Sequence, residues 1–207
     1  MRIFKEPELR KNEILDAAEG LFAAKGFEKA TVMDILNATG IAKGTFYYYF
    51  KSKEEVQDAI IKRRIDAGVE RALAVASDPN LSPVQKILAV IMAQKPQSPA
   101  EKEFNPVLHE PSNALFHQKV LTDCVKSFSP ILADIVKEGI NQGIFSTSFP
   151  LESMEILLTA GLVLFDEAYF IWGREEQAAS MPAFLCAMER ILGAKEGSFL
   201  EFAKVLE

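Results

Sequence analysis

The chain has 207 residues, of which 49% are hydrophobic and 25% charged, a balance ordinary for a globular protein with a sizeable core. Its formal charge of −6 excludes nucleic-acid binding through overall positive charge, so any such function has to be local. The charge is unevenly divided: residues 1–53 carry nine Lys and Arg against seven Asp and Glu, and residues 54–207 carry fourteen against twenty-two. We therefore expect two domains, 1–53 and 54–207.

The cellular compartment is inferred from the cysteines, the N-terminal residues and the longest apolar run. Cys124 and Cys186 lie in apolar helical patterns without metal-ligand spacing, which favours a reducing environment. The N-terminal residues carry charges and no apolar signal core. The longest apolar run, residues 156–165, is too short to span a bilayer. We expect a soluble, cytoplasmic protein that makes no membrane contact.

Helical periodicity begins near the N-terminus. One buried helix face is predicted from the spacing of Ile14, Ala18, Leu21 and Phe22. Gly26 is placed to end that helix in a left-handed cap. Thr31, with Asp34 three residues later, predicts a capping box that starts a second helix, and Gly40 breaks it after two turns. A third short helix then follows in residues 43–50.

The rest of the chain also has helical patterns. Ser52 and Glu55 form a capping-box sequence that predicts a helix to about Ala76, and Ser82 is placed to cap the next one. Four prolines in residues 95–112 predict a loop. Further helices are predicted over residues 113–141, with a kink at Pro130, and over 151–172, 175–192 and 197–206. We predict an all-α fold, because the sequence has no alternating strand pattern.

Five consecutive aromatic residues, Phe46 to Phe50, divide between two faces of the third helix. At 100° per residue, Phe46 and Phe50 share one face with Tyr49 beside them. Tyr47 and Tyr48 lie on the opposite face, on either side of Gly44. We therefore expect the phenylalanines to anchor the helix and two phenols to point outward.

The predicted outward face has groups that suit DNA. Gly44 at its centre lets another molecule approach the main chain, and Lys43, Thr45 and the phenols suit phosphate oxygens and base edges. A two-turn helix after a tight turn is a helix-turn-helix, and it fits a major groove about 12 Å wide. Thr31 with the nearby N–H groups, and Lys53, are expected to receive phosphates. An exposed tyrosine pair beside a lysine can also be ordinary surface.

Residues 14–56, ILDAAEGLFAAKGFEKATVMDILNATGIAKGTFYYYFKSKEEV, resemble the DNA-binding domain of the TetR family of bacterial regulators. The features that carry the resemblance are Leu21-Phe22, Gly26-Phe27, Thr31, Ala38, Gly40, Lys43-Gly44-Thr45, Tyr47-Tyr48-Tyr49-Phe50 and Lys51-Ser52-Lys53-Glu54. Ala42 departs from the pattern, because a serine is frequent there, and one hydroxyl contact is lost. The match covers about a quarter of the chain, and the remainder resembles the family only in architecture.

The resemblance implies a function and assigns contacts. It implies an N-terminal three-helix helix-turn-helix domain, residues 1–53, and a C-terminal helical domain, residues 54–207, for effector binding and dimerisation. A homodimer would bind the half-sites of a palindromic operator in double-stranded DNA, most often as a repressor. The contacts it implies are Thr31 and Lys53 to phosphate, Lys43 and Tyr47 to bases, and Thr45 and Tyr48 mostly to phosphate.

A dimer interface is predicted on the last two long helices. The helix predicted over 151–172 is apolar on nearly all sides from Met154 to Phe165, so it has to be buried all round. One of its faces could pack on a partner subunit. The candidate interface residues are Met154, Leu158, Met181, Leu185, Met188 and Leu192. The alternative is a helix pair in the core of a monomer.

A small-molecule effector pocket is expected among the aromatic residues of the C-terminal domain. The candidate lining residues are Phe104, His109, Phe116, Phe165, Asp166 and Tyr169. Ordinary core packing is the alternative for each of them, and Asp166 with Glu167 could equally lie at a solvated helix end. Residues 95–112 are a candidate gate. We expect ligand binding to favour a conformer in which the helix from Lys53 to Ala76 is tilted.

Two other classes of function remain as alternatives. An enzyme is disfavoured because His109 and His117 lack metal-pair spacing and no catalytic or phosphate-loop motif is present. His117 and Cys124, seven residues apart, are weak evidence for a catalytic dyad. We predict no cofactor and no metal. A helical interaction module that no longer binds DNA is the second alternative.

Overall fold

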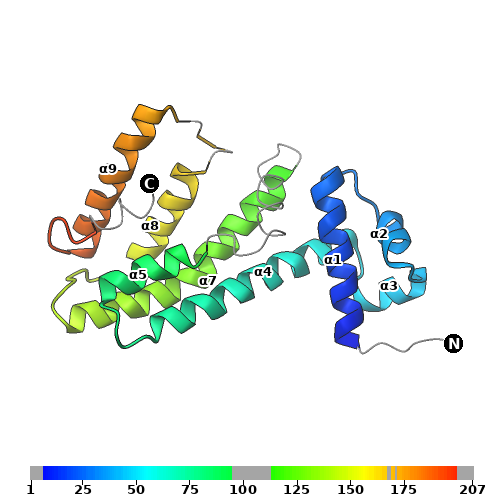
Figure 1. Cartoon of the computed structure of the whole chain (residues 1–207), viewed down its shortest axis with the longest axis horizontal. Coiled ribbons are helices and arrows are strands. Elements are labelled where there is room, and N and C mark those ends of the chain that lie inside the picture. The colour runs from blue at the N-terminus through cyan, green and yellow to red at the C-terminus, as the bar shows by residue number, and fades with distance from the viewer. Residues whose placement is uncertain (1–6, 95–112, 167–168, 171, 200–207) are drawn as a thin grey trace. The chain divides into compact units, whose positions relative to one another are not determined.

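The computed structural model describes residues 7–94, 113–166, 169–170 and 172–199, and its regular elements within these ranges are all helices (Figure 1). They are α1 (Pro7–Lys25), α2 (Val32–Thr39), α3 (Lys43–Tyr49), α4 (Lys53–Ala76), α5 (Pro83–Met92), α7 (Ala114–Asn141), α8 (Pro150–Leu164) and α9 (Arg174–Leu192). The predicted all-α fold is confirmed. None of these helices is long and apolar enough to cross a membrane.

The described residues form two compact units. The first contains residues 7–64 and 113–120, and the second contains residues 65–94 and 121–199. Both α4 and α7 contribute to each unit. The proposed domain boundary after residue 53 coincides with the first residue of α4, whereas the first compact unit extends to Arg64. That boundary stays a prediction.

The first unit is built around side chains from α1, α2, α3 and the start of α4. Its buried core is Ile14, Leu15, Ala18, Phe22, Ala30, Ile35, Leu36, Phe46, Phe50, Val56 and Ile60. Two glycines make the turns that bring the helices together. Gly26 (φ 78°) follows α1 and Gly40 (φ 66°) caps α2, both in the left-handed region that disfavours other residues. Both predicted stop signals are confirmed.

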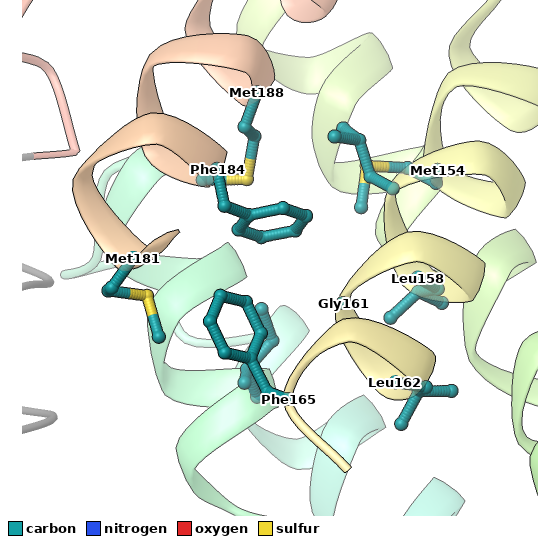
Figure 2. A pocket seen from close by; sticks show the side chains of 10 residues that line it. Met154, Leu158, Gly161, Leu162, Phe165, Met181, Phe184 and Met188 are labelled. Carbon is teal, nitrogen blue, oxygen red and sulfur yellow. The ribbon is translucent and has the colours of Figure 1, made fainter. Parts of the chain in front are cut away.

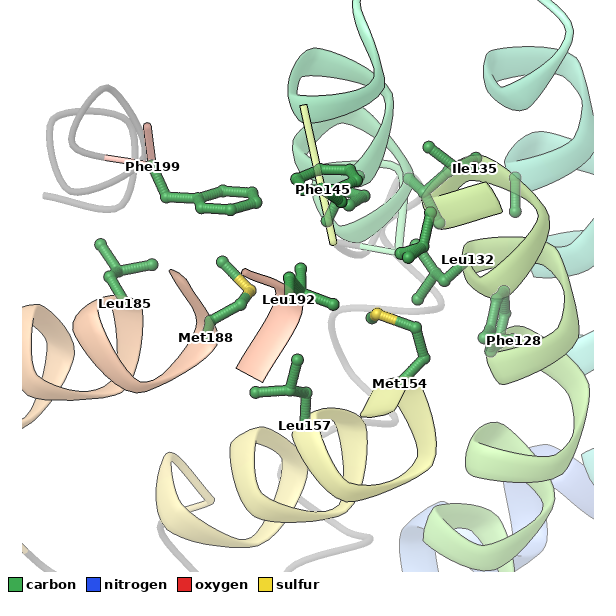
Figure 3. Close-up of a cluster of buried hydrophobic side chains, with 14 residues drawn as sticks. Phe128, Leu132, Ile135, Phe145, Met154, Leu157, Leu185, Met188, Leu192 and Phe199 are labelled. Atoms are coloured by element: carbon green, nitrogen blue, oxygen red, sulfur yellow. The ribbon is translucent and has the colours of Figure 1, made fainter. Parts of the chain in front are cut away.

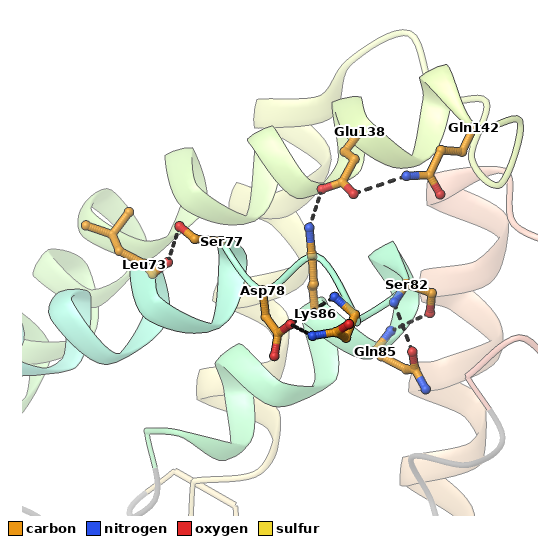
Figure 4. A network of polar contacts seen from close by, with 9 residues as sticks. Leu73, Ser77, Asp78, Ser82, Gln85, Lys86, Glu138 and Gln142 are labelled. Atoms are coloured by element: carbon orange, nitrogen blue, oxygen red, sulfur yellow. Dashed lines mark hydrogen bonds and ion pairs between the residues drawn. The ribbon is translucent and has the colours of Figure 1, made fainter.

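Capping side chains start α4 and α5 where the sequence predicts. Ser82 Oγ accepts a hydrogen bond from Gln85 N, and Gln85 Oε1 accepts one from Ser82 N, which completes a capping box before Pro83 (Figure 4). At α4, Ser52 Oγ accepts from Glu55 N at 3.3 Å. The Glu55 carboxylate instead accepts from Lys51 N, one residue earlier than in a standard capping box.

The second unit has its own apolar core, shared by α4, α5, α7, α8 and α9 (Figure 3). Phe145, after α7, stacks on Phe199 with ring centres 6.3 Å apart. The buried Glu189 carboxylate accepts hydrogen bonds from the main-chain N–H groups of Gly197 and Phe199, both at 3.0 Å. These contacts hold the turn after α9 against the core, although most of the helix predicted over 197–206 lies outside the described residues.

The helix predicted over residues 151–172 is shorter in the structure. α8 ends at Leu164, and Trp172 Nε1 donates a hydrogen bond of 2.8 Å to the Leu164 carbonyl oxygen. A turn follows in which the Asp166 carbonyl accepts from Tyr169 N and Phe170 N, both at 3.0 Å. The indole therefore satisfies a carbonyl that the helix end leaves open.

Candidate nucleic-acid interface and effector cavity

The N-terminus of α2 is closed by its own side chains. Thr31 Oγ1 accepts from Asp34 N at 3.1 Å, and Asp34 Oδ2 accepts from Thr31 N at 2.9 Å, so the predicted capping box is confirmed. Asp34 also receives Lys25 Nζ at 2.8 Å. The hydrogen bond from Lys25 and those from Thr31 lower the pKa of Asp34 from 3.8 to about 2. Thr31 is exposed, and the carboxylate beside it is stably ionised.

The aromatic run divides as its helical spacing predicts. Phe46 is 0% exposed and Phe50 3%, and both lie in the core of the first unit. Tyr49 is half-buried and packs against the same core. On the other face, Tyr47 is 47% exposed and Tyr48 is 78% exposed. The inward and outward assignment of these residues is therefore confirmed. None of the three phenols is fully buried.

The first turn of α3 presents bare main chain. Ala42 occupies the N-cap position and offers no side-chain hydrogen bond. A methyl group built on the exposed Gly44 would meet no neighbouring part of the protein within 4 Å. Lys43 is exposed, and its Nζ lies 5.9 Å from the centre of the Tyr47 ring. Thr45, half-buried, completes this turn. An external surface can approach the helix here more closely than at any side chain.

Lys53 has partners within its own unit. Its Nζ donates to the carbonyl oxygens of Phe27 at 2.7 Å and Glu28 at 3.4 Å. It also lies 4.2 Å from the centre of the Phe27 ring. An ammonium group has three N–H donors, so these two bonds leave one for a phosphate. The phosphate contact of Lys53 stays a prediction, and the structure adds a role in holding the turn between α1 and α2.

Of the predicted effector residues, Phe165, Asp166 and Tyr169 follow α8 together, and Tyr169 N donates to the Asp166 carbonyl at 3.0 Å. Phe104 and His109 lie outside the described residues, as does the candidate gate, residues 95–112. Phe116 is buried in the first unit, whereas Phe165 belongs to the second. Tyr169 is 47% exposed. Asp166 is buried.

A cavity of about 240 Å³ lies between α8 and α9 in the second unit, and Ile91 of α5 also lines it (Figure 2). Its lining residues are Ile91, Met154, Leu157, Leu158, Gly161, Leu162, Phe165, Met181, Phe184 and Met188. Phe165 is the one member of the predicted pocket among them. Sequence reasoning missed Phe184 and Gly161, although a glycine inside an apolar helix is a sign of close packing.

The predicted interface residues mostly serve the core of their own chain. Met154, Leu185, Met188 and Leu192 are at most 3% exposed, and Leu158 and Met181 are partly buried beside them. They have little surface left for a partner in this conformation. Other apolar side chains on the same helices are exposed: Leu151 at 38%, Ile156 at 59% and Ile191 at 37%.

Comparisons with known proteins agree with this architecture. Residues 14–60 match the family model described as bacterial regulatory proteins, tetR family. Residues 97–189 match a second model, the tetracyclin repressor-like C-terminal domain. Together these two matches cover more than half of the chain.

Individual relatives and solved structures are transcriptional regulators. The repressor KstR2 of Mycolicibacterium smegmatis is 28% identical over 152 residues, 68% of this chain and 69% of that protein. The fatty acid metabolism regulator protein of Bacillus subtilis is 25% identical over 186 residues, 86% of this chain and 91% of that protein. A SmeT–triclosan complex has the same fold, with a TM-score of 0.61 at 18% identity over 92% of this chain and 94% of that one. The chain belongs to the TetR family of bacterial transcriptional regulators, which are not enzymes.

Proposed function

We propose that the chain is a repressor that binds a palindromic operator as a homodimer and is released by a small, largely apolar effector. The observation that carries the proposal is the outward face of α3. Exposed Tyr47 and Tyr48 lie on this face with an unobstructed Gly44, while buried Phe46 and Phe50 fix the helix from behind. The exposed phenols and the open main chain at Gly44 add no stability to the fold. A DNA groove offers base edges and phosphates that these groups can contact.

The proposed contacts follow the outward face and its flanks. Lys43 and Tyr47 read bases, and Thr45 and Tyr48 contact phosphates together with Lys53 and Thr31. At α2, a phosphate would compete with the Asp34 carboxylate for the Thr31 hydroxyl, which donates to Asp34 Oδ2 at 2.9 Å. Ala42 and Gly44 contribute main chain and small size rather than side-chain hydrogen bonds.

The second copy of the chain is proposed to pack on the exposed faces of α8 and α9. Ile156 on α8 and Ile191 on α9 are large apolar side chains left in solvent, which a partner can cover. The buried residues predicted earlier for this interface would then support it from inside each subunit. A two-fold dimer would place its two α3 helices on half-sites separated by one or more turns of DNA, roughly 34 Å per turn.

Release by ligand is proposed to occur through a shift between conformers. α4 runs from the first unit into the second, so a change of its tilt can carry a ligand signal to the reader helices. The ligand can shift this balance only by its difference in affinity for the two conformers, typically about 1–3 kcal/mol of coupling. One relative is named a fatty acid metabolism regulator, and one solved structure of the same fold is a complex with triclosan. Both support the proposal of an apolar effector.

Selection of bound sequences from a random duplex library tests the proposal. We expect a palindrome to be enriched and its affinity to fall steeply with salt, because lysine contacts release counterions from phosphates. The rival interaction module would enrich no sequence, and that result would reject the proposal. Sedimentation of the complex at a fixed duplex concentration separates one bound dimer from a bound monomer.

A further inference from the structure

The cavity between α8 and α9 has walls of one chemical kind. Its lining residues are aliphatic, aromatic or thioether side chains and one glycine, and none of these described residues carries a charge. The rings of Phe165 and Phe184 meet edge to face, with centres 5.5 Å apart (Figure 2). Such rings, with the sulfurs of Met154, Met181 and Met188, favour hydrocarbon and aromatic surfaces.

A charged ligand is disfavoured by the same walls. A carboxylate placed among these side chains would lose part of its hydration without gaining a hydrogen-bond donor from them. An uncharged molecule pays no such cost, and its apolar surface is transferred out of water. The lining therefore selects against ionised groups by desolvation.

The volume indicates the size of the ligand. An apolar cavity of about 150 Å³ in another protein holds benzene, which has six non-hydrogen atoms. The present cavity, at about 240 Å³, is larger in proportion and suits roughly ten such atoms. A fused pair of aromatic rings has this size.

We propose that this cavity is the effector site and that it takes an uncharged hydrocarbon or aromatic molecule of about ten non-hydrogen atoms. The inference rests on the proposed function, because it names the ligand class of that regulator. Gly161 of α8 lines this cavity and lies beside the Phe184 ring of α9. A methyl group on it would lie 3.2 Å from the end of the Phe184 ring, so this side chain of α9 reaches the main chain of α8 at this point. A ligand that displaces the Phe184 ring therefore removes a contact between α8 and α9.

The test uses naphthalene and 2-naphthoate as a pair that differs in charge but shares its rings, and equilibrium dialysis against the full chain. We expect naphthalene to bind at least about tenfold more tightly than 2-naphthoate. Leu162→Trp, which fills the cavity, should weaken naphthalene binding about tenfold or more. Met181→Lys, which adds a cation at the wall, should reverse the order of the two ligands. Leu115→Lys, at an 80% exposed position in the first unit, is the matched control.

The possible outcomes test the ligand class of the cavity and the regulator function separately. Equal binding of the two ligands, undetectable naphthalene binding, or unchanged naphthalene binding in both cavity variants would overturn the inference. With a selected duplex, naphthalene should release DNA from the original chain and fail to do so with Leu162→Trp. Naphthalene binding without release would overturn the effector assignment. Failure to select any duplex would reject the proposed function, while the dialysis would still decide what the cavity binds.

Discussion

Lys53 Nζ lies 2.7 Å from the carbonyl oxygen of Phe27 and 4.2 Å from the centre of its ring. The N–H of Phe27 donates to Asn113 Oδ1 at 3.1 Å, immediately before α7. The main chain of this one residue is therefore held by the start of α4 on one side and by the residue before α7 on the other. Because Phe27 lies in the turn that leads to α2, these bonds connect this turn to the starts of α4 and α7.

Replacing Lys53 with alanine should have two effects. The Phe27 carbonyl loses a charged donor, so we expect the free energy of unfolding to fall by about 1–3 kcal/mol in urea titrations. Binding to all duplex sequences should weaken alike, and the slope of log affinity against log salt should flatten by about one unit. Lys51→Ala, two residues away and exposed, is the control for loss of a positive charge. An unchanged salt slope would remove Lys53 from the phosphate contacts.

Asn113 should matter for stability although it lies far from Phe27 in the sequence. It is 3% exposed, and Asn113→Ala leaves the Phe27 N–H without this acceptor. We expect a loss of about 1–3 kcal/mol in the free energy of unfolding, because a part-buried N–H group is left without its acceptor. Asn113→Asp keeps an oxygen acceptor and should recover part of the loss. Asn141→Ala, at an exposed position, should change little, and equal losses at both positions would contradict this role.

Local signals in the sequence predict much of the helical framework. Thr31 and Gly40 bracket α2, and Ser82 starts α5, because capping and left-handed turns depend on residues close together in the chain. The face of α3 that carries Tyr47 also follows from helical spacing alone. Each of these features depends on residues that lie only a few positions apart in the sequence.

Local signals in the sequence could not predict the end of α8 or the cavity. α8 stops at Leu164, where the indole N–H of Trp172, beyond the following turn, donates to the Leu164 carbonyl, and no glycine or proline marks the stop. The cavity depends on how Phe184 meets Gly161 across two helices. Both arise from packing between segments, which apolar periodicity does not specify.

Tyr47 should contribute to sequence preference more than to overall affinity. Tyr47→Ala should reduce the difference in binding free energy between the selected duplex and single-base variants by about 1–3 kcal/mol at one position. Fluorescence anisotropy across a set of substituted duplexes measures this difference. Phe149→Ala removes a 65% exposed ring in the second unit and should leave the preference intact. An unaltered preference in Tyr47→Ala would mean that this phenol reads no base.

Asp34 should make stability depend on acidity. Its folded pKa of about 2 lies below the ordinary value of 3.8, so its stabilising effect is complete above the ordinary value and is lost as pH falls toward 2. The difference in unfolding free energy between the original chain and Asp34→Asn should therefore shrink as pH is lowered from about 5 to about 3. Urea titrations at several pH values measure it. Asp134→Asn, on the exposed face of α7, is the control, and a difference that stays constant with pH would contradict the prediction.

Gly44→Ala tests most directly whether the outward face of α3 receives DNA. The added methyl group meets no neighbouring part of the protein, so stability should be unchanged or raised by up to about 1 kcal/mol, as for a helical glycine replaced by alanine. Gly20→Ala in α1, where the space is equally open, should have the same effect on stability and none on DNA. The decisive measurement is the affinity of both variants for the selected duplex. We predict a loss of about tenfold or more in Gly44→Ala alone, because the methyl group keeps the main chain away from the groove. Undiminished affinity in a stable Gly44→Ala protein would contradict DNA recognition by this face.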